Sequence, residues 1–197
     1  MAGVAEMKRL LRDAHGFTLA ELLIVVAVLG FMMGALFTLQ RQGQLAYLTG
    51  AARVEVQQNA RIALDMMVND LRAAQPVAGS VTRVLTGIDA NCNTGTPPTS
   101  GGGTSMGFTD QFSKTVTYQM SGTDLQRVYN GTTDVLIGGV QSLQIWCYNA
   151  GGTLDSNLDN IREVLIQIKT QTERTAQAGS PGDQHAVVEG RVRFRNI

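Results

Sequence analysis

An acidic residue near the start of a long apolar stretch is the feature of this sequence most able to do chemistry. Glu21 stands in the segment HGFTLAELLIVVAVLG, residues 15–30. The 18 residues from Leu22 to Leu39 that follow it carry no charge. As a helix they span about 27 Å, close to the thickness of a bilayer core. An acid at mid-bilayer costs about 3 kcal/mol on insertion, so Glu21 needs a partner or a place near the interface.

A chain cut between Gly16 and Phe17 supplies that partner. The new α-amino group of Phe17 has a reference pKa of about 7.7–8.0 and is mostly protonated at neutral pH. In apolar surroundings this cation and the Glu21 carboxylate are each costly alone and far cheaper as a pair. The alternative is that Glu21 lies near the membrane interface and extends its carboxylate to water.

The residues around this step resemble the cleavage and methylation motif of type IV prepilins and type II secretion pseudopilins. The matching run is Gly16-Phe17-Thr18-Leu19-Ala20-Glu21-Leu22-Leu23. The resemblance implies that a membrane prepilin peptidase cuts after Gly16 and then methylates the Phe17 amine. It also implies that Glu21 pairs with the N-terminus of a neighbouring subunit during assembly. Methylation keeps the positive charge, so the pairing argument still holds.

The apolar run is too long for a typical secretory signal of about 7–15 apolar residues, and we expect it to stay with the protein. Lys8, Arg9 and Arg12 precede it and only Arg41 follows closely, which places the N-terminus in the cytoplasm and exports the C-terminal part. The expected divisions are a leader at 1–16, a transmembrane and assembly helix at 17–39, an amphipathic helix at 40–75 and a β-rich exported domain at 76–197.

One helix is expected from about residue 17 to residue 75, where Pro76 stops it. Its second half has apolar residues every three or four positions, which is one face of a helix. They are Leu45, Leu48, Ala52, Val56, Ala60, Ala63, Met67, Leu71 and Ala74. Gly30 and Gly34 form a GxxxG step in the apolar half, which either allows close helix packing or reflects the frequency of glycine in membrane helices.

The C-terminal part is expected to form an antiparallel sheet, which makes the fold class α+β. Short apolar runs alternate with polar residues, as strands with one buried face do. Ser121 to Asp124 reads as a hairpin turn, and residues 91–107 as a long exposed loop rich in Gly, Thr, Pro and Ser. The expected strands are 81–88, 115–120, 125–129, 140–148, 164–170 and 187–194.

Further phrases resemble PilW-type minor pilins and J-type minor pseudopilins. They lie at residues 58–64, 69–72, 116–118, 125–127, 139–143 and 193–196. Together with the N-terminal motif they extend over most of the chain. They imply a subunit that primes the filament or lies at its tip, and they do not separate a pilus from a secretion pseudopilus.

Cys92 and Cys147 are the only two cysteines, and both fall in the part expected to be exported. An even count in an oxidising compartment is typical of a disulfide. Closing this loop would stabilise the fold by about 4 kcal/mol in the chain-entropy model. The alternative is a buried Cys147 on a strand and a free Cys92 in a loop.

The remaining polar groups do not predict a catalytic or cofactor site. Residues 155–159 begin like a calcium loop, but Asn160 and Ile166 replace the required Gly and Glu, so either an irregular cation site or a solvated turn is expected. His15 and His185 lie apart from any triad or metal motif. Arg191, Arg193 and Arg195 alternate with apolar residues and read as the solvated side of an edge strand, or as a docking surface.

Taken together, these patterns predict a structural protein with neither a cofactor nor a catalytic centre. The expected role is a minor pilin or pseudopilin of a type IV pilus or type II secretion pseudopilus, anchored in the inner membrane with a periplasmic domain. The expected partners are prepilin peptidase, other pilins or pseudopilins, the inner-membrane assembly platform and membrane lipid. The net charge of zero predicts no nucleic-acid partner. The rival interpretation is a single-pass anchored binding domain, and an anchored hydrolase would need a triad that is missing.

Overall fold

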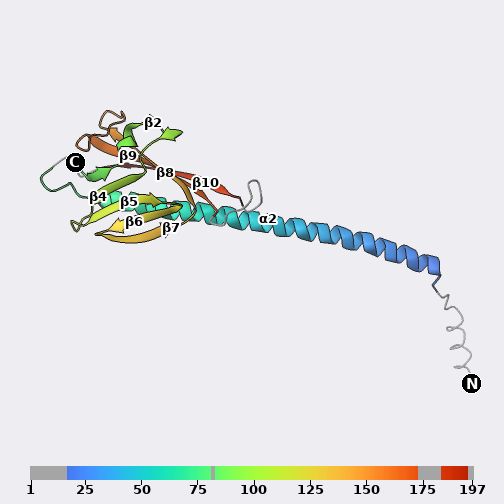
Figure 1. Ribbon diagram of the computed structural model, residues 1–197. Helices are drawn as coiled ribbons and strands as arrows, with labels where there is room; N and C mark the ends of the chain where they lie inside the picture. Colours follow the sequence, from blue (N-terminus) through green and yellow to red (C-terminus); the bar gives the residue numbers. More distant parts are fainter. Residues whose placement is uncertain (1–16, 81–82, 173–182, 195–197) are drawn as a thin grey trace, which may run out of the picture. The chain divides into compact units, whose positions relative to one another are not determined.

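The computed structural model describes residues 17–80, 83–172 and 183–194. The helix α2 runs without interruption from Leu19 to Ala73 (Figure 1), within the predicted span of 17–75. It ends before Pro76, because the residue that precedes a proline is driven out of the helical conformation. That residue, Gln75, instead forms an isolated β-bridge with Thr109.

The chain divides into two compact units, residues 1–46 and residues 47–197. In the second unit, α2 turns one face into the core, which confirms the predicted stripe from Val56 onward. The buried residues on this face are Val56, Ala60, Ala63, Leu64, Met67 and Leu71. The prediction was wrong for the start of this face, because Leu45 and Leu48 are 44% and 57% exposed.

Two large antiparallel sheets and one two-stranded sheet make up the β-rich part of the second unit, among the described residues (Figure 1). The five-stranded sheet has the order β1-β4-β5-β6-β7. Its strands are β1 (Leu85–Ile88), β4 (Ser105–Thr109), β5 (Thr115–Ser121), β6 (Asp124–Tyr129) and β7 (Thr132–Ile137). The three-stranded sheet has the order β10-β9-β8, with β8 (Val140–Asn149), β9 (Ile161–Gln171) and β10 (His185–Arg193). The predicted α+β class with antiparallel pairing is therefore confirmed.

Two hairpins of the larger sheet are fixed by their turn residues. Gly122 at φ 62° begins the two-residue turn between β5 and β6, as the sequence predicted. Asn130 at φ 48° and Gly131 at φ 89° form the equivalent turn between β6 and β7. Positive φ at both central positions is the type I′ turn that matches the twist of a hairpin.

The largest error was the prediction that residues 91–107 form one exposed loop. This segment contains the 3₁₀-helix η1 (Ala90–Asn93), the hairpin of β2 (Gly95–Thr96) and β3 (Ser100–Gly101), and the start of β4. Cys92 and Met106 in this segment are buried. The segment is held down because Gly103 exchanges two backbone hydrogen bonds with Ile145 of β8, at 2.7 and 2.9 Å.

The helix and both sheets share one hydrophobic core. Met67 and Leu71 come from α2, Phe108 and Tyr118 from the larger sheet, and Ile166 from the smaller one. Large side chains that are almost wholly removed from water supply most of the favourable folding free energy. The second half of α2 is therefore an integral part of this domain.

A polar clamp, which we define as Asp70, Tyr118 and Arg127, joins α2 to the larger sheet. The Tyr118 hydroxyl donates to Asp70 Oδ2 at 2.7 Å, and Arg127 Nε donates to the same oxygen at 2.9 Å. The Arg127 guanidinium also lies 4.8 Å from the centre of the Tyr129 ring. Burial, followed by the hydrogen bond to Asp70, raises the pKa of Tyr118, which stays protonated as the donor.

We expect Asp70→Ala to lower the free energy of unfolding by about 1–3 kcal/mol, because it leaves a buried hydroxyl and a guanidinium without their acceptor. The loss is less than for a fully buried pair, since Asp70 and Arg127 are 28% and 23% exposed. Urea unfolding of the full chain in detergent, followed by Trp146 fluorescence, measures it. Asp65→Ala is the matched control on an exposed position of the same helix, and equal losses in both variants would refute the clamp.

Candidate processing and assembly site

The start of α2 is organised by Thr18 and Glu21. Thr18 precedes the first helical residue, and its Oγ1 accepts a hydrogen bond from the Glu21 backbone N–H at 3.2 Å. Glu21 Oε2 in return accepts from the Thr18 backbone N–H and from the Thr18 hydroxyl, both at 2.9 Å. This reciprocal arrangement is a capping box, which satisfies backbone donors that the first helical turn leaves unpaired.

Sequence reasoning named Glu21 as an assembly residue and missed its role in the cap. The sequence does contain the pattern of a capping box, because Thr18 and Glu21 have the T-x-x-E spacing that precedes an apolar helical run. The consequence is that Glu21 has an intramolecular partner for one carboxylate oxygen. Among the described residues no hydrogen bond reaches its other oxygen, Oε1.

The structure describes only one of the two residues that flank the predicted cleavage site. Gly16 lies outside the described residues. Phe17 lies just before the capping box, with 83% of its surface exposed. Phe17 is adjacent to Thr18, whose N–H contacts the Glu21 carboxylate, so the structure brings the predicted methylation position and the predicted assembly acid into one short turn.

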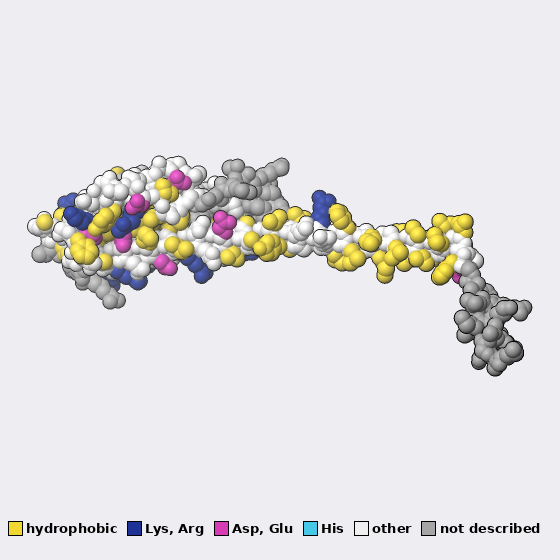
Figure 2. Space-filling view, turned by 90° about the horizontal axis from the view of Figure 1, so that it is seen from below, with side chains coloured by type: hydrophobic (Ala, Val, Ile, Leu, Met, Phe, Trp, Pro, Cys, Tyr) yellow, Lys and Arg dark blue, Asp and Glu magenta, His cyan; other side chains and the backbone are white. Residues whose placement is uncertain are grey.

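The apolar residues that follow have no covering partner among the described residues. Leu22, Val25, Leu29 and Leu36 are each 50–63% exposed, and Phe31 is 82% exposed. Figure 2 shows hydrophobic side chains gathered along this part of α2. The helix is long and apolar enough to cross a membrane, and none of its most apolar window is buried within the chain. Such a surface requires lipid or other apolar helices around it.

Gly30 and Gly34 lie one turn apart on this exposed part of the helix. A Cβ added at either position would meet no atom within 4 Å. Neither glycine is therefore required for packing within the described part of the chain. The GxxxG step leaves a smooth strip where a second helix can approach the backbone closely.

The remaining predicted sites lie in the second unit and do not join the N-terminal site. Cys92 and Cys147 are both buried and are both free thiols in this structure. In the predicted cation turn, Asp155 accepts hydrogen bonds from the Asn157 N–H at 2.8 Å and from Asn160 Nδ2 at 3.0 Å. Groups of three metal-ligating side chains are absent from the described residues.

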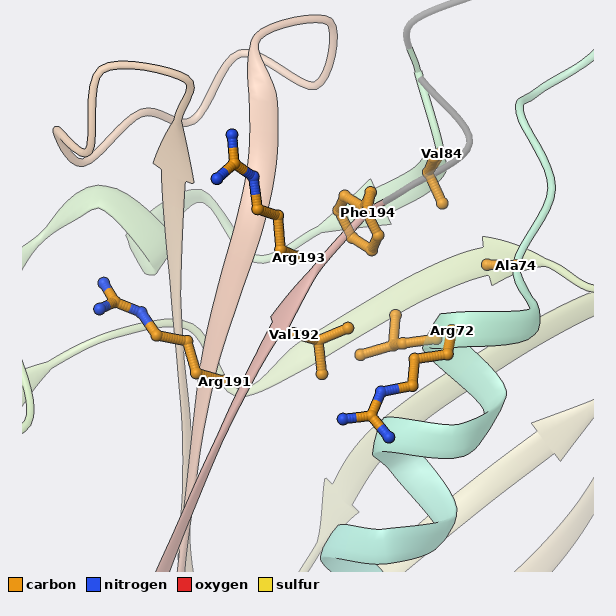
Figure 3. A pocket seen from close by; sticks show the side chains of 8 residues that line it. Arg72, Ala74, Val84, Arg191, Val192, Arg193 and Phe194 are labelled. Atoms are coloured by element: carbon orange, nitrogen blue, oxygen red, sulfur yellow. The ribbon is translucent and has the colours of Figure 1, made fainter.

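A hollow of about 420 Å³ lies between the end of α2 and strand β10. In Figure 3, Val192 and Phe194 point toward the helix end and Val84, whereas Arg191 and Arg193 extend to the opposite side of the strand. Arg191 pairs there with Glu163 and lies 4.8 Å from the centre of the Tyr148 ring. Exposed and buried residues alternate along β10, which confirms that these two arginines occupy the solvated side of an edge strand.

Comparison with known proteins bears on the N-terminal site. The family described as the prokaryotic N-terminal methylation motif matches residues 11–37. This match includes Gly16, Phe17, Thr18 and Glu21, together with most of the exposed apolar helix. A search of curated proteins found no match to the chain. The N-terminus of this chain therefore carries the methylation motif of type IV prepilin-like leaders, ahead of a long helix and two large antiparallel sheets.

Proposed function

We propose that this chain is a minor pilin or pseudopilin, a structural subunit that primes or tips a type IV pilus or a type II secretion pseudopilus. The observation that carries the proposal is the sequence of features at the N-terminus. A methylation motif is followed by a capped helix whose apolar residues find no partner within the described chain. The minor-subunit role rests on the resemblance of phrases along the helix and sheets to PilW-type and J-type proteins.

The proposed maturation starts with prepilin peptidase, which cuts between Gly16 and Phe17 and methylates the new amine. Before cleavage the leader remains attached next to the capping box, and no amine exists there. Cleavage creates a cation one residue from Thr18, beside a carboxylate whose Oε1 takes no hydrogen bond from the described residues. The α-amine of the same or a neighbouring subunit can then contact Oε1 while Oε2 keeps the helix capped.

In the membrane, the apolar helix is solvated by lipid until a filament forms at the inner-membrane assembly platform. In the filament the same surface packs against the helices of other pilins or pseudopilins. The helix end that carries Asp70 is fixed in the β-rich core, so the domain follows the helix as it is incorporated. The domain is expected to lie in the periplasm before assembly and on the filament afterwards.

We expect Glu21→Gln and Glu21→Ala to be cleaved normally and to lose at least about tenfold in filament incorporation, because both remove the charge that pairs with the amine. Glutamine can retain the capping box, whereas alanine cannot. Thr18→Ala is the complementary variant, since it removes the cap and keeps the carboxylate. The measurement is the ratio of processed subunit in sheared filaments to that in membranes.

Three outcomes separate the two roles of Glu21. Reduced filament incorporation of both Glu21 variants, with nearly normal incorporation of Thr18→Ala, supports charge pairing. Normal incorporation of Glu21→Gln, with loss in Glu21→Ala and Thr18→Ala, would show that only the cap matters. Normal incorporation of every variant would contradict the assembly role of this site.

We expect Gly30→Leu and Gly34→Leu to reduce incorporation by roughly fivefold while leaving the stability of the β-rich domain unchanged. The leucine side chains meet nothing within this chain but obstruct a neighbouring helix. Ala35→Leu is the control, because it adds similar bulk on another side of α2. Incorporation equal to that of Ala35→Leu would show that Gly30 and Gly34 take no part in assembly.

A further inference from the structure

Two cysteines far apart in the sequence meet inside the β-rich domain. Cys92 lies in η1, between strands β1 and β4 of the larger sheet, and Cys147 lies in β8 of the smaller sheet. Neither exposes any surface to solvent. Asp155 connects the two cysteines, because its backbone N–H donates to the Cys147 carbonyl at 3.0 Å. The Cys92 thiol also donates to the Asp155 carbonyl at 3.7 Å.

The backbone on both sides of Cys92 is held in place without help from sulfur. Asp89 Oδ1 accepts the Asn91 N–H at 3.0 Å, and Asp89 Oδ2 accepts the Thr104 N–H at 3.0 Å. These bonds close the base of the segment 89–104. Gly103 then joins the segment to Ile145 of β8 through two backbone hydrogen bonds. The thiols are thus brought together by contacts that persist whatever their redox state.

We propose that Cys92 and Cys147 form a disulfide once the domain has been exported. Each thiol loses its hydrogen, one S–S bond forms, and two electrons and two protons pass to a thiol–disulfide oxidoreductase in its disulfide form. The bond ties the connection between β1 and β4 to β8. It therefore links the two sheets covalently, at the place where Gly103 and Ile145 already pair.

The chemistry of the pair is suited to a structural bond. The hydrogen bond between the thiols lowers the pKa of Cys92, whereas the same bond and burial raise the pKa of Cys147. A reactive or catalytic cysteine needs an accessible sulfur as well as a lowered pKa, and both of these residues are fully buried. No third metal-ligating side chain among the described residues joins the two sulfurs. Because the folded thiols are buried, the oxidoreductase reaches them when the segment 89–104 opens transiently, and its closing brings the two sulfurs together again.

The test uses the full chain extracted from membranes of a host that has prepilin peptidase and an exported thiol oxidoreductase. The protein is denatured, alkylated with iodoacetamide and digested, with and without prior reduction. We expect no label on either cysteine before reduction, a linked pair of peptides that contain Cys92 and Cys147, and full labelling after reduction. Cys92→Ser and Cys147→Ser are matched controls, in which the remaining thiol is labelled without reduction.

The proposal rests on export of the domain, so the same digest also reports the N-terminal peptide. Unreduced protein that begins at Phe17 and carries two labels would overturn the disulfide and leave the proposed function intact. Protein that begins at Met1 or Ala2 and contains the linked peptides would contradict the pilin proposal and support the disulfide. A disulfide to another chain, with no Cys92–Cys147 peptide, would also overturn the proposal.

A second measurement tests what the bond does. Hydrogen exchange at the amides of Cys92 and Thr94, which donate to Asp89 and Asn91, reports local opening of the segment. We expect this exchange to be about tenfold faster in Cys147→Ser, because the segment loses its covalent tie to β8. Amides of β5 and β6 serve as the internal reference. Equal exchange in both proteins would show that the segment gains nothing from the bond.

Discussion

The structure depends on one helix, α2, whose apolar first part needs lipid or other helices around it and whose second part is buried in the domain core. Over Leu22 to Leu39 the apolar side chains of α2 are exposed, and only lipid or other apolar helices can solvate them. From Val56 onward the same helix contributes buried residues to a core that it shares with two sheets. A subunit built in this way is anchored by one part of its helix and folded around the other part.

The two ends of α2 are each fixed by polar contacts of a specific kind. At the N-terminal end, Thr18 and Glu21 cap the first turn, so the acid is already ordered before any amine reaches it. Near the C-terminal end, Asp70 accepts hydrogen bonds from Tyr118 and Arg127 of the larger sheet. A carboxylate ordered in advance loses less side-chain entropy when its partner arrives, which favours pairing during assembly.

The sequence was most informative where periodicity reflects one-sided burial. The helix, its buried face from Val56 to Ala74 and the alternating strands β5 and β10 follow directly from spacing. Strand β4 was missed because Met106, Gly107 and Phe108 are all buried, so its pattern does not alternate. Strand β7 was missed because the Asn130-Gly131 turn, a strong hairpin indicator, was not used.

The candidate site was predictable in its residues and only partly in its geometry. Gly16, Phe17 and Glu21 follow from the motif, but the role of Thr18 required attention to T-x-x-E spacing. The burial of Cys92 could not be foreseen, because its neighbours Asn91 and Asn93 are typical of exposed loops. Its position depends on the long-range pairing of Gly103 with Ile145, which no local pattern encodes.

The most direct test is mass spectrometry of the N-terminal peptide from membrane-extracted protein, with and without the prepilin peptidase of the host. The proposed function predicts a peptide that begins at N-methylated Phe17 in the complete strain and disappears in the strain without the peptidase. A peptide that begins at Met1 or Ala2 in both strains would contradict it. The exposed helix would then be a simple membrane anchor, and Glu21 would serve only to cap it.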